Sequence, residues 1–333
     1  LSQLSDPMLE GGHSLKAWGE RLGFGKMDYN DFSHFNEEML KYCIKDVQLT
    51  HKLYLHLLPT LKKYSKKSMF LEHQIRAIVN KQEENGFKLD VEQADKLCSK
   101  LEEEADKIEK DLQEIFPPII TERYSEKTGK RLDDSVEEFN PNSRQQISKR
   151  LIEKGWKPEN LTPTGHPIVD EGTLKRVKNI PEALQIAHYL LLQKRVSQIK
   201  SWIDVVQEDG KVHGRVMTLK AISGRMAHNS PNMAQVPASY SPYGKECRSV
   251  WIPTNSNYVL LGCDASSLEL RCLAHYMGDS KFTKEVVEGD IHTANQKAAG
   301  LKTRDQAKTF IYALIYGAGP DKIGQIMSNL LCF

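Results

Sequence analysis

Four side chains that can bind a charged, ring-containing ligand recur at every fourth position near the end of the sequence. They are two cations followed by two tyrosines: Arg304, Lys308, Tyr312 and Tyr316. Residues four apart lie on one side of an α-helix, and the row drifts by about 40° per step because four residues overshoot one turn. Twelve residues rise about 18 Å, so cations at one end can meet a triphosphate while a ring at the other stacks on a base. The alternative is a solvated helix flank whose tyrosines pack on neighbours.

A carboxylate follows the apolar segment NYVLLGCD, which predicts a buried β-strand that ends at Asp264. A carboxylate at the tip of a strand opens onto a cleft, where ions and phosphates are handled. Glu269 lies five residues later, on the predicted following helix. The alternative reading makes Asp264 only the N-cap of that helix, a role that aspartate favours. His292, beside Asp290 at the start of another helix, either contacts a ligand or is a surface polar residue.

A polar segment upstream, AISGRMAHNSPNMAQVPASYSPYGKECRSVW, has little hydrophobic periodicity. Its Asn and Gln amides can read acceptors in a DNA minor groove, and Arg225 and Arg248 can neutralise phosphates. The equally weighted alternative is a structured loop whose polar residues satisfy their own backbone.

The elements that must position these residues follow from local patterns. An apolar stripe with helical spacing should hold the row of cations and tyrosines, and Gly317 and Gly319 should end that helix. The stripe comprises Ala307, Phe310, Ile311, Leu314 and Ile315. Residues 1–70 are expected to be mainly helical.

Two helices are expected within residues 71–116, the first ending at Gly86 and the second opened by a capping box of Asp90 and Gln93. The second should be an exposed antiparallel arm with a thin apolar seam. Residues 117–141 are expected to be a loop, and helices should follow it. The pattern becomes strand-like near residue 211, so we place a boundary near residue 203.

The totals are those of a soluble globular protein of two or three domains. The chain has 333 residues, a net charge of +2 and 39% hydrophobic residues. Mild basicity is compatible with nucleic acid but does not establish it. Six cysteines show no metal-binding spacing, and Cys263 and Cys272 are expected to be reduced core residues. No segment resembles a membrane span or signal peptide, and the first residue, Leu1, indicates that the chain begins inside a longer one.

Several of these motifs resemble those of family A (polymerase I type) DNA polymerases, most closely the replicative polymerases of short-tailed phages. CDASSLELRCLAH is similar to motif A, RDQAKTFIYALIYGAG to motif B on the fingers helix, and SGRMAHNSPNMAQVP to the primer–template binding segment. GGHSLKAWGERLG, GDIHT and SPYGKECR add to the resemblance, which covers nearly the whole chain.

The resemblance implies an α+β fold, a partial right-hand polymerase. Residues 1–70 would be the C-terminal remnant of a ribonuclease H-like 3′–5′ exonuclease domain, and residues 71–203 the linker and helical thumb. Residues 204–277 would form the first half of the palm sheet, and residues 278–333 the start of the helical fingers.

The resemblance also implies a role for each candidate residue. Asp264 would ligate two catalytic Mg²⁺ ions, one of them also contacted by the Ala265 carbonyl, and Glu269 would be the steric gate that excludes ribonucleotides. The triphosphate of the dNTP would be held by His292, Arg304 and Lys308. Tyr312 would lie by its sugar and base, where tyrosine implies tolerance of 3′-deoxy chain terminators, and Tyr316 would stack at the template position. Primer–template contacts would come from Arg225, Asn232, Gln235 and Arg248. The reaction would be attack of the primer 3′-OH on the α-phosphate, in the host cytoplasm if the protein is phage-encoded.

The sequence departs from the family pattern in three places. The family needs a second palm aspartate in a His-Asp-Glu motif, which these 333 residues lack. Two divalent ions with one carboxylate bind poorly, so we expect this chain alone to be inactive. An assembly error, a frameshift near MSNLLCF or a split gene would each explain this. Tyr42 and Asp46 match only the third exonuclease motif, Tyr-x-x-x-Asp. The short 117–141 segment makes a thioredoxin-type clamp partner doubtful.

The leading hypothesis is therefore a truncated DNA-directed DNA polymerase. The alternatives are a 3′–5′ exonuclease or its remnant, and a module that binds primer–template without catalysis.

Overall fold

The computed structural model of the chain describes residues 1–124 and 127–328, and it divides into two compact units. The first runs from Leu1 to Leu260 and the second begins at Leu261. Helices dominate both units, and short antiparallel strands accompany them in the first. The predicted α+β class is confirmed, whereas the predicted four-part domain organisation stays a prediction. Residues 329–333, which end the MSNLLCF segment and include Cys332, lie outside the described residues.

The first unit opens with four helices, as the helical pattern of residues 1–70 predicts. They are α1 (Ser2–Ser5), α2 (Leu15–Arg21), α3 (Glu37–Leu61) and α4 (Lys66–Asn85). Polar side chains begin three of them: Ser14, Asn36 and Ser65 each accept a hydrogen bond from a first-turn backbone N–H. A small core of Trp18, Leu57 and Leu61 joins α2 to α3.

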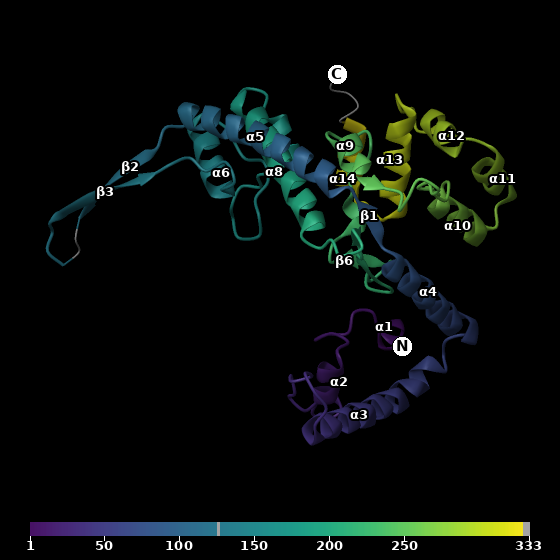
Figure 1. The fold of residues 1–333 in the computed structure, drawn as a ribbon. Helices are drawn as coiled ribbons and strands as arrows, with labels where there is room; N and C mark the ends of the chain where they lie inside the picture. Colours follow the sequence, from purple (N-terminus) through teal and green to yellow (C-terminus); the bar gives the residue numbers. More distant parts are fainter. Residues whose placement is uncertain (125–126, 329–333) are drawn as a thin grey trace. The chain divides into compact units, whose positions relative to one another are not determined.

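Two long helices form the centre of the first unit. α5 (Val91–Ile115) packs antiparallel against α8 (Glu182–Ile203), and Figure 1 shows them side by side. The predicted apolar seam of α5 is buried between them, from Ala94 to Leu112. Aromatic rings complete this core, including Tyr189, Trp202 and the more exposed Trp251 of β7 (Trp251–Ile252).

The start of α5 differs from the capping box predicted for it. The Asp90 carboxylate accepts from the Gln93 N–H at 3.0 Å, so the cap itself is confirmed. The second half of the capping box, a hydrogen bond from the Asp90 N–H to the Gln93 side chain, was predicted wrongly. The Asp90 N–H instead donates to the Val250 carbonyl at 2.8 Å, and the Gln93 amide donates to Ser249 Oγ at 3.4 Å. Long-range contacts have replaced the local one.

A second core lies between the far end of α5, α8 and two short helices. These are α6 (Arg144–Glu153) and α7 (Glu171–Arg176), both at positions where the sequence predicts helices. Leu151, Leu174 and Ile186 are fully buried there.

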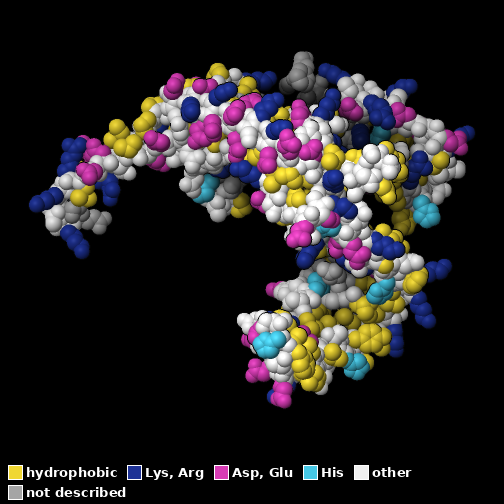
Figure 2. Space-filling model, in the orientation of Figure 1, with side chains coloured by type: hydrophobic (Ala, Val, Ile, Leu, Met, Phe, Trp, Pro, Cys, Tyr) yellow, Lys and Arg dark blue, Asp and Glu magenta, His cyan; other side chains and the backbone are white. Residues whose placement is uncertain are grey.

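Residues 119–124 and 131–137 are the two paired strands of a β-hairpin, so the loop predicted for residues 117–141 is wrong. β2 (Ile119–Tyr124) pairs with β3 (Arg131–Glu137), with Ile120 opposite Val136. Nearly every side chain of the hairpin is exposed, which removes the alternation that normally reveals a strand in a sequence. Figure 2 shows Lys and Arg side chains gathered at its far end. Within β3, Arg131 pairs with Asp134 at 3.3 Å.

Three very short strands join distant parts of the first unit in one antiparallel sheet. β1 (Phe87–Leu89) lies between β4 (Lys211–Val212) and β7. Gly86 before β1 has φ +59°, and a Cβ there would lie 2.8 Å from the His213 ring. Glycine is therefore required where the backbone passes this ring. A second pair joins β5 (Arg215–Met217) to β6 (Ala227–Asn229), before the short helices η1 (Met233–Gln235) and α9 (Gly244–Ser249).

The buried strand predicted for NYVLLGCD is absent, and this prediction is wrong. Residues 257–264 have no regular structure, and Val259 and Leu261 are 84% and 90% exposed. A strand needs a hydrogen-bonded neighbour, and no strand among the described residues pairs with this segment. Cys263 and Cys272 are consequently exposed rather than core residues, whereas Cys98 and Cys247 are buried.

The second unit is mainly helical between residues 268 and 328. Its helices are α10 (Leu268–Met277), α11 (Ser280–Glu288), α12 (Ile291–Ala298), α13 (Arg304–Ile315) and α14 (Pro320–Ser328). A small core of Leu270, Ala274, Val286 and Ile291 holds them, with Ile311 and Ile315 of α13 packed against it. Within the described residues, none of the helices combines the length and apolar character that crossing a membrane requires.

Candidate active site

A polar cavity of about 500 Å³ in the second unit is lined by seven of the candidate site residues that the sequence predicts. It is bounded by the loop before α10, the start of α12 and one side of α13. Its lining residues are Asp264, Ala265, Ser266, Ser267, Leu268, Glu269, His292, Arg304, Lys308 and Tyr312. Carboxylates and cations therefore face one space, although up to 44 positions separate them in the chain.

The loop that carries Asp264 reaches the cavity without a strand behind it. Asp264 is exposed, and the N-cap of α10 is Ser267, which has φ +51°. The alternative reading of Asp264 as a helix cap is thus wrong. Its carboxylate and the neighbouring Ala265 line the cavity together.

The predicted row on α13 is largely confirmed by the helix boundaries. Thr303 caps the helix through a reciprocal contact with Gln306, Arg304 is its first residue, and Gly317 with φ +75° follows its end. The apolar stripe opposite the row is only partly buried. Ala307 is fully buried, whereas Leu314 is 53% exposed, so the prediction is wrong for Leu314.

Tyrosines at the far end of the row meet the α10 carboxylate. Tyr316, just beyond the last residue of α13, donates its hydroxyl to Glu269 Oε1 at 3.0 Å. Burial, and then the negative charge of Glu269, raise the pKa of the Tyr312 hydroxyl. Tyr312 therefore stays a neutral hydrogen-bonding group in the cavity at neutral pH.

A carboxylate outside the cavity holds the cation at the start of the row. Asp290 accepts from Arg304 Nε at 2.9 and 3.2 Å. The hydrogen bond from Arg304, followed by one from Thr293, holds the pKa of the Asp290 carboxyl far below its ordinary value of 3.8. Sequence reasoning placed Asp290 beside His292 but gave it no function.

His292 is the most buried of the polar residues lining the cavity. It is 5% exposed, and its Nδ1 has no hydrogen-bond partner among the described residues. Its ring centroid lies 6.0 Å from that of Tyr312. Burial and the neighbouring Arg304 lower the pKa of the imidazole below its ordinary value of 6.5, so His292 is neutral at pH 7.

Acidification should destabilise the second unit through His292. The unfolded chain takes up a proton at this residue near pH 6.5 and the folded chain only at lower pH, so the free energy of unfolding should fall as the pH drops below about 6.5. Urea titrations followed by circular dichroism between pH 7.5 and 5 check this. His292→Gln should flatten the dependence, and His275→Gln, at an exposed position, should not. Equal slopes in all three proteins would contradict the prediction.

Metal ligands are sparse around this cavity. Asp264 and the Ala265 carbonyl provide oxygen ligands of the kind that Mg²⁺ prefers. No group of three or more His, Cys, Asp or Glu side chains suited to a metal ion occurs in residues 1–124 and 127–328. Among the described residues, the ligands that line this cavity are therefore fewer than two divalent ions need.

The four predicted primer–template residues lie in the first unit, and two of them have internal roles. Asn232 caps η1 by accepting from the Ala234 N–H, and Arg248 Nε donates to the Pro237 carbonyl at 2.8 Å. These contacts support the structured-loop reading for part of the segment. Arg225 and Gln235 have exposed side chains.

Tyr42 and Asp46 lie on α3, and among the described residues neither belongs to a group of three or more His, Cys, Asp or Glu side chains suited to a metal ion. Asp46 pairs with Lys26 at 3.2 Å, and the Lys26 ammonium lies 4.9 Å from the centre of the Tyr42 ring. A lysine therefore faces both residues of the exonuclease-like motif.

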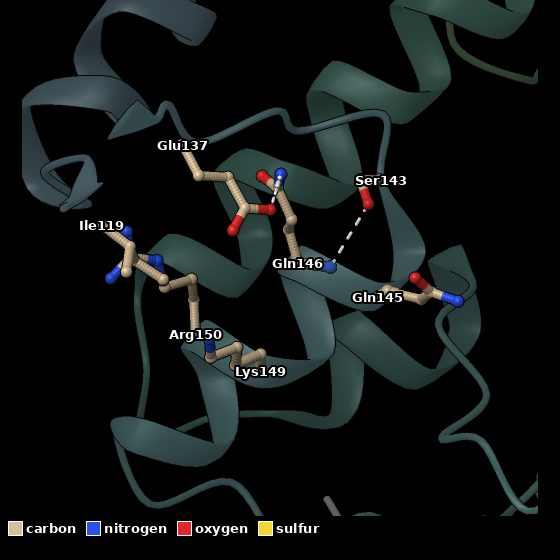
Figure 3. Close-up of a pocket in the computed structure, with 7 residues that line it drawn as sticks. All are labelled: Ile119, Glu137, Ser143, Gln145, Gln146, Lys149 and Arg150. Carbon is tan, nitrogen blue, oxygen red and sulfur yellow. Dashed lines mark hydrogen bonds between the residues drawn. The ribbon is translucent and has the colours of Figure 1, made fainter. Parts of the chain in front are cut away.

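A smaller cavity of about 210 Å³ lies between the base of the hairpin and α6, as Figure 3 shows. The Gln146 amide donates to Glu137 at 2.8 Å, and Arg150 donates to the Pro117 carbonyl. These contacts fasten the hairpin to α6, so the cavity has a structural explanation.

Sequence comparisons identify related proteins. The model of DNA polymerase family A matches residues 94–329. The DNA-directed DNA polymerases of Enterobacteria phage T3 and Escherichia phage T7 are each 35% identical to this chain over an alignment of 421 residues. The alignment covers 95% of this chain and 60% of each relative. This chain thus spans about 60% of the length of those relatives.

A solved structure shares the fold. The POL domain of Pol1 from M. smegmatis, in complex with a DNA primer–template and dNTP, superimposes with a TM-score of 0.76 at 16% identity. The similarity covers 98% of this chain and 57% of that one. At this identity it is informative about the fold alone.

Proposed function

This chain belongs to DNA polymerase family A. We propose that it functions as part of a phage-type, DNA-directed DNA polymerase in phage DNA replication. The reaction is the template-dependent addition of dNTPs to a primer 3′-OH. One observation carries the proposal: seven residues expected to bind nucleotide or metal line a single cavity. They are Asp264, Ala265, Glu269, His292, Arg304, Lys308 and Tyr312.

Each side of the cavity suits one part of a dNTP. Arg304 and Lys308 attract the triphosphate, and His292 brings an imidazole whose protonation the phosphates would favour. Tyr312 offers a flat ring to the sugar and base. Glu269, which accepts a hydrogen bond from Tyr316, would crowd a ribose 2′-OH and so exclude ribonucleotides.

Mg²⁺ would accompany the triphosphate and stabilise its charge, as in phosphoryl transfer generally. Asp264 and the Ala265 carbonyl would hold it. Because the residues present do not complete a two-ion site, we assign to this chain the binding of nucleotide and primer–template, without the chemical step.

Binding without extension is the expected result with a primer–template duplex. In a gel-shift assay the chain should bind the duplex, and with Mg²⁺ and dNTPs it should not extend the primer. Arg225→Ala should lower the slope of log affinity against log salt by about 1, since one phosphate contact is lost. Arg176→Ala, at another exposed arginine of the first unit, should leave the slope unchanged.

The possible outcomes separate the readings. Primer extension would overturn the assignment of binding alone. Absence of binding to both DNA and dNTP would overturn the polymerase proposal. Metal-dependent shortening of the primer would favour the exonuclease alternative, which the Lys26–Asp46 pair disfavours because the ammonium competes with a metal ion. Action in the host cytoplasm belongs to the same proposal, whereas the shortness of the hairpin argues against a thioredoxin-type clamp as a partner.

A further inference from the structure

A single carboxylate links the starts of two helices at the edge of the cavity. Asp290 is the N-cap of α12, where it accepts from the backbone N–H of His292 at 3.2 Å and of Thr293 at 3.4 Å. The Thr293 hydroxyl donates to its other oxygen at 2.8 Å. The same carboxylate also accepts a hydrogen bond from Nε of Arg304, the first residue of α13.

The way Asp290 holds Arg304 determines which nitrogens remain available. Only Nε donates to Asp290, and the two terminal guanidinium nitrogens have no hydrogen-bond partner among the described residues. Arg304 lines the cavity, whereas Asp290 does not. A guanidinium with both terminal nitrogens available can bind two phosphate oxygens at once, and fixing its orientation beforehand lowers the entropic cost of binding.

We propose that Asp290 is a positioning residue for the nucleotide: it fixes the Arg304 guanidinium at the edge of the cavity so that its two terminal nitrogens receive the triphosphate. The proposal rests on the proposed function, because the cavity must take a dNTP. Asp290 touches no substrate itself, and it acts through Arg304. By capping α12, it also fixes the backbone that carries His292, so two phosphate-facing side chains depend on one carboxylate.

Substitutions can separate the two roles of Asp290, which are to cap α12 and to hold Arg304. Serine caps helices about as well as aspartate, but its hydroxyl lies one bond closer to the backbone and carries no charge. Asp290→Ser therefore keeps a capping group at α12 and removes the partner of Arg304. Asp290→Asn keeps a neutral acceptor at the original distance. Asp279→Ser is the matched control, since Asp279 caps α11 by accepting from the Phe282 N–H at 2.8 Å and makes no ion pair with Arg304.

The experiment is equilibrium dialysis of the full chain with radiolabelled dTTP and Mg²⁺, with inorganic tripolyphosphate as competitor. Asp290→Ser should weaken dTTP binding about tenfold, the scale seen when a metal ligand loses its supporting hydrogen bond. The loss should be smaller in Asp290→Asn, and tripolyphosphate should lose affinity in parallel with dTTP. Asp279→Ser should match the unmodified chain.

A double-mutant cycle distinguishes positioning from a folding role. In an Arg304→Ala background, Asp290→Ser should change affinity by less than roughly twofold, because the residue it acts through is gone. An equal loss of affinity in both backgrounds would overturn the proposal. Unchanged or tighter binding by Asp290→Ser alone would also overturn it, because it would mean that the Asp290 carboxylate only repels the triphosphate. Absence of dTTP binding by the unmodified chain would overturn this inference, and it would overturn the proposed function only if the chain also failed to bind DNA.

Discussion

Replacing Trp202 by alanine is expected to lower the free energy of unfolding of the first unit by about 3–5 kcal/mol, the usual cost of removing a buried tryptophan side chain. Trp202 is 2% exposed near the end of α8 and meets Trp251 edge-on, with ring centroids 5.3 Å apart. It thereby joins the α5–α8 pair to the sheet strand β7. The indole leaves a large void that these regular elements cannot close, so the loss should be near the upper end.

Urea denaturation followed by far-ultraviolet circular dichroism measures this effect. Tyr240→Ala is the control, because Tyr240 lies in the same unit and is 93% exposed. It should change the free energy of unfolding by less than about 0.5 kcal/mol. A change of under 1 kcal/mol for Trp202→Ala would mean that this core is not packed as described.

Patterns that depend on neighbouring residues were predicted well. The row on α13, its glycine end and the seam of α5 follow from the helical period, which a sequence displays directly. The cavity followed because the motif resemblance had already grouped its residues. For the row and for the seam, the information lies within a few turns of one helix.

Features that depend on distant partners were predicted poorly. The segment NYVLLGCD has strand composition, yet no described strand pairs with it, and Leu261 is exposed. The hairpin at residues 119–137 was missed for the opposite reason, since exposed, charged strands give no alternation. The link between Asp290 and Arg304 spans 14 positions and two helices, so only the folded chain reveals it.

Removing the second cation of the row should have the largest effect on ligand binding. Lys308→Ala is expected to weaken dTTP binding by about 10- to 100-fold, because a charge-assisted contact to phosphate is worth about 1.5–3 kcal/mol. Lys308 lines the cavity one helical turn after Arg304, and the described residues include no ion pair that already engages it. Its charge also acts on His292, whose imidazole pKa it helps to lower.

The ammonium of Lys308 should therefore act as a point charge facing the phosphates, and its effect should shrink as ionic strength rises. Lys308→Arg should keep most of the affinity, since it retains the charge. Lys297→Ala is the matched control, an exposed lysine of α12 that does not line the cavity, and it should stay within roughly twofold of the unmodified chain. If Lys308→Ala and Lys297→Ala weakened dTTP binding equally, the cavity would not be where the triphosphate binds, because only one of the two lysines faces it.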